Sequence, residues 1–206
     1  MKDKPILFSS EMVRAIKEGR KTMTRRVIKE MTVLSNWYFD YLDDQAVYFK
    51  DPRKTMKGVQ AKYPYEVGQK LWVRETFSTK RQEDGVNFYT PTDLTYKADP
   101  ETYSHFPDDT RMIWTPSIFM PRALSRITLE VTDIRFEPLD VIWYEDAVDE
   151  GVAPIEKGSH LYKNYLNPES SGVNAIHSFS TLWDSINGKG AFAKNPWVWV
   201  IQFKVL

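Results

Sequence analysis

The sequence predicts a single α+β domain in which a β-barrel carries short helices and long loop insertions. Three observations favour this fold class. Several segments alternate apolar and polar residues, which is typical of half-buried strands. Shorter segments repeat apolar residues at helical spacing, and the long stretches between them show neither pattern. The chain of 206 residues also has the size of one large domain.

The first half of the chain is expected to contain one helix among four strands. Ser9 or Ser10 can cap the helix, and Gly19 ends it just after Glu18, because glycine readily adopts the backbone conformation that terminates helices. The strands are indicated by alternation or by short apolar runs. We expect strands at 5–8, 46–50, 71–75 and about 95–98, and insertions at about 30–66 and 78–113.

The second half is expected to contain two helices, two strands and a third insertion. Gly151 ends a short helix, and Asn187-Gly188 ends a longer one whose apolar residues recur at helical spacing. Pro116 and Pro121 bracket a short extended segment. We expect helices at about 144–150 and 175–186, strands at 126–131 and 197–206, and an insertion at about 152–172.

The composition excludes several classes of protein. The chain has no cysteine, which excludes disulfide scaffolds, iron–sulfur clusters, zinc–thiolate sites and thiol catalysis. The 3 histidines lack helical metal-ligand spacing, so only a site made of carboxylates stays open for a metal. The apolar run at the N-terminus is too short for a signal peptide, and no segment approaches the roughly 20 apolar residues of a membrane span. We therefore expect a cytoplasmic protein without a membrane partner.

Charge is unevenly distributed along a chain whose net charge is zero. The neutral total argues against indiscriminate binding to duplex nucleic acid, which needs a basic surface. Residues 14–29 are strongly basic, whereas residues 130–157 are strongly acidic. Two interpretations stay open. Either two solvated faces attract each other across the fold, or a basic edge binds an anion opposite a carboxylate.

Two segments could carry chemistry. After the first helix, the run from Gly19 to Arg26 alternates cations and hydroxyls. A structural role would also explain this run, because basic residues past a helix C-terminus complement the helix dipole and threonine suits a strand. Glu150 stands in the last turn of a helix, where the dipole disfavours a carboxylate by roughly 0.3–1 kcal/mol. That placement is a weak functional signal by itself.

These residues resemble a known family. The pattern Gly-x-Lys-x-x-(Glu or Thr)-x-Arg is met by Gly19, Lys21, Thr24 and Arg26. It resembles the signature of ASCH domains, a branch of the PUA-like β-barrels, and the longer chain resembles phage- or prophage-encoded ASCH proteins. The resemblance implies a PUA-like barrel with short helices at its rim. Similar segments cover about half of the chain, at 67–75, 114–122, 145–151, 182–187 and 197–199.

The resemblance also implies an activity. The family includes bacterial amidohydrolases that remove the acetyl group of N4-acetylcytidine, with a catalytic Lys and Thr in a Gly-Arg-Lys-Thr-x-Thr run. This implies that Lys21, Thr24 and Glu150 are catalytic, that the substrate is a small nucleoside-like amide, and that no metal or organic cofactor is needed. One departure stands out: Arg25 and Arg26 are consecutive, whereas the amidohydrolases have a single arginine two residues after the threonine.

A second group of residues is expected around the substrate. Trp72 and Arg74 share a strand face, and a flat ring and a guanidinium suit a nucleobase. Arg26 and Glu75 complete the predicted substrate-binding group. In this family reading, the large insertions could cover or reshape the pocket.

Two mechanisms stay open for the catalytic group. In the first, Thr24 attacks the acyl carbon and Lys21 is its base, which requires a neutral amine and thus a pKa well below about 10.4. In the second, Glu150 acts as the general acid or base through water, and a cationic Lys21 stabilises the oxyanion.

Two other functions also stay open. The chain could be a non-catalytic RNA-binding module that uses the same cleft and the basic edge. It could instead be a phage accessory protein that binds a host partner through its insertions. The neutral net charge favours a small substrate over long RNA.

Overall fold

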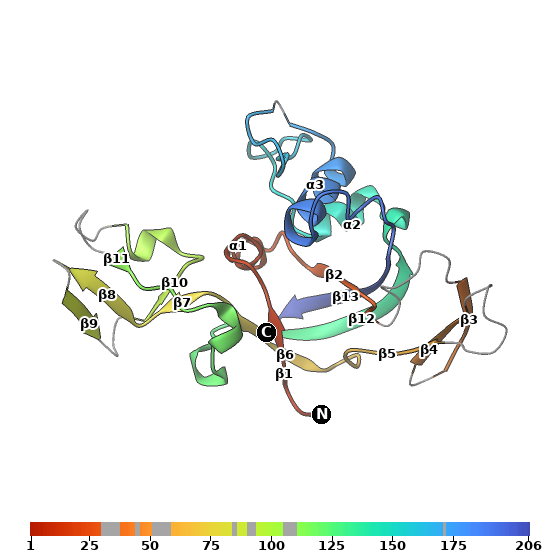
Figure 1. Ribbon diagram of the computed structural model, residues 1–206, viewed down its shortest axis with the longest axis horizontal. Helices are drawn as coiled ribbons and strands as arrows, with labels where there is room; N and C mark the ends of the chain where they lie inside the picture. The colour runs from red at the N-terminus through yellow and green to blue at the C-terminus, as the bar shows by residue number, and fades with distance from the viewer. Residues whose placement is uncertain are drawn as a thin grey trace. The chain divides into compact units, whose positions relative to one another are not determined.

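The computed structural model describes the chain except for 30–37, 44–45, 51–58, 84–85, 90–93, 105–110 and residue 171 (Figure 1). The chain is divided into two compact units. The first unit comprises Met1–Gly19, Gln69–Glu130 and Lys204–Leu206, and the second comprises Arg20–Gly68 and Val131–Phe203. Both units combine several strands with few helices, so the predicted α+β class is confirmed. The single domain over 1–206 stays a prediction.

The first unit is built around β6 (Lys70–Arg74), which pairs parallel with β1 (Lys4–Leu7) and antiparallel with the start of β12 (Thr128–Pro138). Leu71 and Val73 alternate with more exposed neighbours along β6 and are buried, as the pattern predicted. Its other elements are α1 (Ser10–Lys17), β7 (Phe77–Ser78), β8 (Lys80–Glu83), β9 (Val86–Tyr89), β10 (Thr95–Tyr96), η2 (Pro100–Thr102), β11 (Arg111–Met112), η3 (Ser117–Phe119) and η4 (Arg122–Leu124).

Helix α1 confirms its predicted boundaries and the reasons for them. The Ser9 side chain accepts a hydrogen bond from the Met12 backbone N–H at 3.3 Å, which satisfies a free donor at the helix start. Val13 and Ile16 are buried on one face of the helix. Gly19 follows with a φ of +72°, a left-handed conformation that favours glycine.

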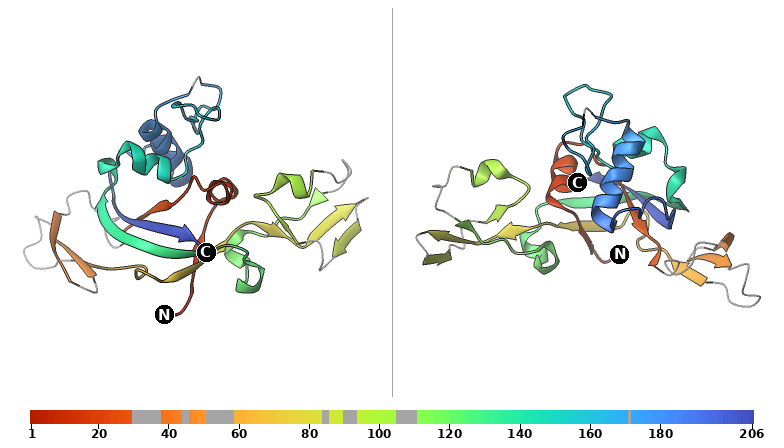
Figure 2. Two further views of the ribbon diagram at one scale, coloured as in Figure 1. Left: turned by 180° about the vertical axis from the view of Figure 1, so that it is seen from behind. Right: turned by 45° about the horizontal axis from the view of Figure 1, so that its top comes forward.

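The second unit places two helices against one face of a sheet (Figure 2). Strand β2 (Met23–Val27) pairs antiparallel with β13 (Trp197–Val205), and β12 continues into this unit. The remaining elements are β3 (Tyr38–Leu42), β4 (Ala46–Lys50), β5 (Val59–Lys62), η5 (Leu139–Val141), α2 (Tyr144–Asp149) and α3 (Ala175–Asn187). The last three strand and helix predictions of the chain, at 144–150, 175–186 and 197–206, are confirmed to within a residue.

The core of the second unit lies between these helices and strands. Met23 of β2 and Val200 of β13 contribute the sheet side of this core, whereas Ala147 of α2 and Phe179 of α3 contribute the helix side. Burying a large apolar side chain stabilises a fold by roughly 1.5–3 kcal/mol. This core therefore fixes α2 over β2, which is the arrangement that brings the candidate site together.

The sheets of the described residues do not close into a barrel. The largest sheet has the strand order β1-β6-β12-β13-β2, which has two open ends, and three smaller sheets accompany it. The insertion at about 30–66 is more regular than expected, because β3, β4 and β5 pair antiparallel and bury Val47 and Phe49. The insertion at about 78–113 likewise contains a three-stranded sheet of β11, β8 and β9.

One local prediction was wrong. The segment between Pro116 and Pro121 is not extended but forms the 3-10 helix η3, because the Phe119 N–H donates to Pro116 O and the Met120 N–H donates to Ser117 O. In the parts of the chain that the structure describes, no helix has both the length and the apolar character needed to cross a bilayer.

Candidate functional site

Lys21 and Glu150 form a buried pair in the second unit. The Lys21 ammonium donates to Glu150 Oε2 at 2.9 Å and to the Glu150 backbone carbonyl at 2.7 Å. The exposed fractions of the two residues are 1% and 4%. An antiparallel backbone bridge joins the same two residues, and the Thr22 N–H donates to Asp149 O at 2.9 Å beside it. Two residues that lie far apart in the sequence are thus held by both backbone and side chains.

The end of α2 explains how the carboxylate reaches this position. Glu150 is the C-cap residue of α2, its N–H donates to Asp146 O at 2.9 Å, and Gly151 turns the chain with a φ of +85°. The helix dipole disfavours a carboxylate here, and the buried Lys21 ammonium compensates for it. The unfavourable placement noted in the sequence therefore has a cation as its partner.

Burial controls the protonation of Lys21. Loss of hydration lowers the pKa of its ammonium below the ordinary value, whereas the charge and hydrogen bond of Glu150 act to raise it. The charges of Arg26 and Arg25 lower this pKa further. A buried lysine whose proton is loosened in this way, beside a fixed carboxylate, has the character of a chemically active group.

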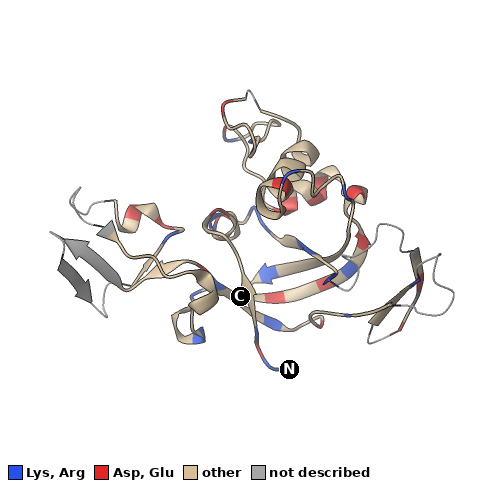
Figure 3. Cartoon of the chain, in the orientation of Figure 1, with Lys and Arg blue, Asp and Glu red and all other residues tan. Residues whose placement is uncertain are grey.

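Arg25 connects this pair to two more carboxylates. Its Nη1 lies 3.4 Å from Glu150 Oε1, and its Nη2 contacts Glu137 Oε1 at 2.6 Å and Asp146 Oδ2 at 2.5 Å. Arg135 contacts the same two carboxylates, at 3.1 Å from Glu137 and 2.7 Å from Asp146. Figure 3 shows the acidic residues of α2 and β12 and the basic residues of β2 from which this network is built.

Sequence reasoning did not assign Glu137, Asp146 or Arg135 to the site, and it noted Arg25 as a departure from a motif and as part of the basic stretch 14–29 that could bind RNA. A signal was present, however. Arg25 shares a face of β2 with Met23 and Val27, which pack in or against the core, so its side chain needs buried anionic partners.

Thr24 and Arg26 occupy the alternate positions of β2. Thr24 is buried with an exposed fraction of 2% and lies opposite Ile201 of β13, whereas Arg26 lies opposite Trp199. Burial lowers the pKa of Arg26, and the charges of Tyr65 and Glu150 oppose that effect. Burial likewise raises the pKa of the Tyr65 phenol. Arg26 therefore lies within the electrostatic environment of the Lys21–Glu150 pair, and its substrate role stays a prediction.

The other predicted substrate residues belong to the first unit. The Arg74 guanidinium lies 5.3 Å from the centre of the Trp72 ring and donates to Met120 O at 3.0 Å. Glu75 is buried and accepts two hydrogen bonds from Arg126, each of 2.9 Å. The partner of Glu75 gives it a structural role within its own unit. The substrate role of these three residues stays a prediction.

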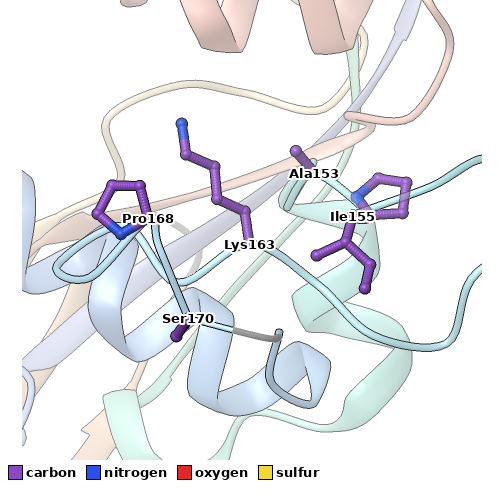
Figure 4. A pocket seen from close by; sticks show the side chains of 6 residues that line it. Ala153, Ile155, Lys163, Pro168 and Ser170 are labelled. Carbon is purple, nitrogen blue, oxygen red and sulfur yellow. The ribbon is translucent and has the colours of Figure 1, made fainter.

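A cavity of about 390 Å³ opens in the loop that follows α2 (Figure 4). The Ser170 hydroxyl oxygen is buried there and has no hydrogen-bond partner among the described residues. The Lys163 ammonium lies 5.0 Å from the centre of the Tyr165 ring. The described part of the chain holds no cluster of three or more acidic or histidine side chains placed to bind a metal. The cavity is lined by Ala153, Pro154, Ile155, Lys163, Pro168 and Ser170.

Comparisons with known proteins give no assignment. No protein family matches the chain, and no curated protein or solved structure matches it either.

Proposed function

We propose that this protein is an amidohydrolase of the ASCH type, with a PUA-like fold, that acts on an N-acylated cytosine nucleoside or a related small amide. One observation carries the proposal. The motif resemblance selects Lys21 and Glu150, and their side chains meet at 2.9 Å in a buried site. Residues chosen for surface charge alone have no reason to form such a pair.

The protonation of Lys21 supports the mechanism in which it acts as a base. Amide hydrolysis needs a nucleophile, proton transfer and stabilisation of the oxyanion. Because burial lowers the pKa of Lys21, the neutral amine is more accessible than in an exposed lysine. Lys21 would take the proton of the Thr24 hydroxyl as its oxygen bonds to the acyl carbon. The C–N bond then breaks, the amine leaves with that proton, and water hydrolyses the acyl-enzyme.

Internal pairing of the basic residues favours a small substrate over RNA. Lys17 pairs with Asp99 at 2.6 Å, Arg20 donates to Gly151 O at 2.9 Å, and Arg25 is held by carboxylates. Cations committed in this way are poorly placed to replace counterions on a phosphate backbone. No observation favours the RNA-binding or accessory-protein alternatives.

Steady-state hydrolysis of N4-acetylcytidine tests the proposal, with released cytidine measured by liquid chromatography. Lys21→Ala should lower kcat by at least about a thousandfold, the scale typical of a lost acid–base group. Lys194→Ala removes an exposed lysine of the same unit and should leave kcat unchanged. Wild-type protein without turnover, or an active Lys21→Ala variant, would reject the proposed activity.

Two further variants separate the mechanisms. If Thr24 is the nucleophile, Thr24→Ala abolishes turnover and Thr24→Ser keeps some. If water attacks with Glu150 as base, Thr24→Ala loses only the roughly 1.5–3 kcal/mol of a charged hydrogen bond, about 10- to 150-fold in rate. Glu150→Gln is then the more damaging change. Equal, modest losses from both variants would show that neither assignment is right.

A further inference from the structure

Arg25 is a completely buried guanidinium that contacts three carboxylates from different elements. Glu137 belongs to β12, Asp146 to α2 and Glu150 to the cap of α2. The Arg25 side chain has an exposed fraction of 0%, its Nη1 also lies 3.3 Å from Met23 Sδ, and its guanidinium carbon lies 5.8 Å from the centre of an aromatic ring of α3. A planar guanidinium presents five N–H donors in fixed directions, so it can hold several carboxylates in a set geometry.

The two oxygens of Glu150 are divided between two cations. Oε2 accepts from Lys21 at 2.9 Å, and Oε1 faces Arg25 Nη1 at 3.4 Å. With one cation on each oxygen, the rotation of the carboxylate is fixed. Among the described residues, Lys21, Arg25 and Arg135 pair with Glu137, Asp146 and Glu150, and Arg135 also lies 4.0 Å from Asp133.

We propose that Arg25 is a positioning residue that holds Glu150 through Oε1, keeps Oε2 on Lys21, and shares the Glu150 charge between two cations. The proposed role in catalysis rests on the proposed function, whereas the control of Lys21 does not. This positioning role would explain why the chain carries Arg25, the arginine by which it departs from the amidohydrolase motif. Arg25 acts through Glu150 and Lys21, not through contact with the substrate.

Removing Arg25 has a defined electrostatic consequence. Arg25 then no longer competes with Lys21 for the Glu150 carboxylate, and the direct repulsion between Arg25 and Lys21 is lost. Both changes stabilise the ammonium, so the pKa of Lys21 rises. The other charged groups near Lys21 stay in place, since Arg26 remains beside it with Tyr65 as its own neighbour.

The experiment compares three variants with the wild type. Arg25→Gln removes the charge but keeps hydrogen-bond donors. Arg25→Lys keeps the charge but loses the planar, branched arrangement of the guanidinium donors. Arg135→Met is the matched control, because Arg135 contacts Glu137 and Asp146 but belongs to neither side of the Lys21–Glu150 contact, and its side chain is 34% exposed. Two quantities are measured: the pH dependence of kcat and KM for N4-acetylcytidine, and the titration of Lys21 by NMR of lysine-labelled protein, assigned with Lys21→Arg.

Arg25→Gln should raise the pKa of Lys21 by about one pH unit and move the kcat profile to higher pH. At a pH where Lys21 is mostly protonated in the wild type, this corresponds to about a tenfold loss in kcat with KM unchanged. Arg25→Lys should raise the pKa by less, and Arg135→Met should leave it where it is. A folded Arg25→Gln protein with the wild-type Lys21 titration would overturn the proposal.

The NMR titration needs no turnover. An inactive wild type would therefore reject the proposed amidohydrolase activity, and the titration would still decide whether Arg25 controls the pKa of Lys21. Thermal unfolding followed by circular dichroism checks that each variant folds. If Arg25→Gln does not fold, Arg25→Lys decides alone. A raised Lys21 pKa then supports the proposal, and an unchanged one overturns it.

Discussion

Replacing Lys21 by methionine should destabilise the protein by about 3–5 kcal/mol, the scale for breaking a buried ion pair by removing one partner. Methionine fits the space left by the lysine stem, so the effect comes from the charge and not from a cavity. Among the described residues, the Glu150 side chain would keep the 3.4 Å contact with Arg25, in a site where its exposed fraction of 4% admits almost no water. The variant therefore leaves a carboxylate with too few partners.

The magnitude follows from the contacts that are lost. The Lys21 ammonium makes two charged hydrogen bonds, at 2.9 and 2.7 Å, and such bonds contribute about 1.5–3 kcal/mol each. Glu150→Gln should cost less, about 1–3 kcal/mol, because a neutral amide still accepts from Lys21 and the lysine can release its proton. The double variant has no stranded charge and should be less destabilised than Lys21→Met alone.

Urea unfolding of the four proteins forms a double-mutant cycle, with equal m-values as the check that the unfolding transition is unchanged. A coupling energy of about 2–3 kcal/mol is expected for groups in direct contact. pH adds a second test. Because the pKa of Lys21 is lower in the folded state, the unfolded state binds more protons between that pKa and about 10.4, so stability rises with pH across this window. That rise should vanish in Lys21→Met. The reasoning would be refuted if the effects of the two single variants were additive, or if Lys21→Met lowered the free energy of unfolding by less than about 1 kcal/mol.

Two further predictions concern stability alone. Burial acts to raise the pKa of Asp99, but the hydrogen bonds and charges of Arg126 and Lys17 outweigh it and lower this pKa. The stability that Asp99 contributes is therefore present above about pH 4 and is lost as pH falls through the folded pKa. Asp99→Asn should reduce the loss of unfolding free energy between pH 7 and pH 3 in urea unfolding, and an unchanged loss would contradict this prediction. Asn174 caps α3 by accepting from the His177 N–H at 2.9 Å, so Asn174→Ala should lower the free energy of unfolding by about 0.5–2 kcal/mol, and an unaltered thermal midpoint would exclude this cap.

Elements with local signals could be predicted from the sequence. The helices α1, α2 and α3 were placed to within about a residue, because a capping side chain or a terminating glycine marks their ends. In the insertion at about 30–66, the strand predicted at 46–50 is confirmed as β4. Its neighbours β3 and β5 could not be predicted, because they are defined by pairing with β4 and not by their own pattern. The prediction for the segment after Pro116 was wrong for a related reason. Backbone hydrogen bonds between residues three apart, and not side-chain alternation, form its 3-10 helix.

The candidate site was only partly predictable. Lys21 and Glu150 were selected by a motif and by an odd placement at a helix end, and the structure brings them together. The contacts of Arg25 with Glu137 and Asp146 join β2, β12 and α2, and no local pattern encodes such pairings. The charge segments gave a hint, because the basic and acidic stretches do attract each other. They do so in the interior of the second unit, however, and not as the solvated faces that one interpretation expected.

Each unit contains an ionic network, and the two differ at Lys21. The pKa of Arg135 in the second unit is raised, as that of Arg126 is in the first, whereas the pKa of Lys21 is lowered. In the first unit, burial acts to lower the pKa of Arg126, but the contacts with Glu75 and Asp99 outweigh it and raise that pKa. The pKa of Asp99 is lowered in turn. Both shifts favour the charged forms, so neither group is ready to exchange a proton, as expected of a structural network. In the second unit burial prevails at Lys21, and the pKa of its ammonium falls although a carboxylate lies 2.9 Å away. Holding a lysine in a site that disfavours its charge weakens the fold, and such a cost is typical of groups kept for chemistry.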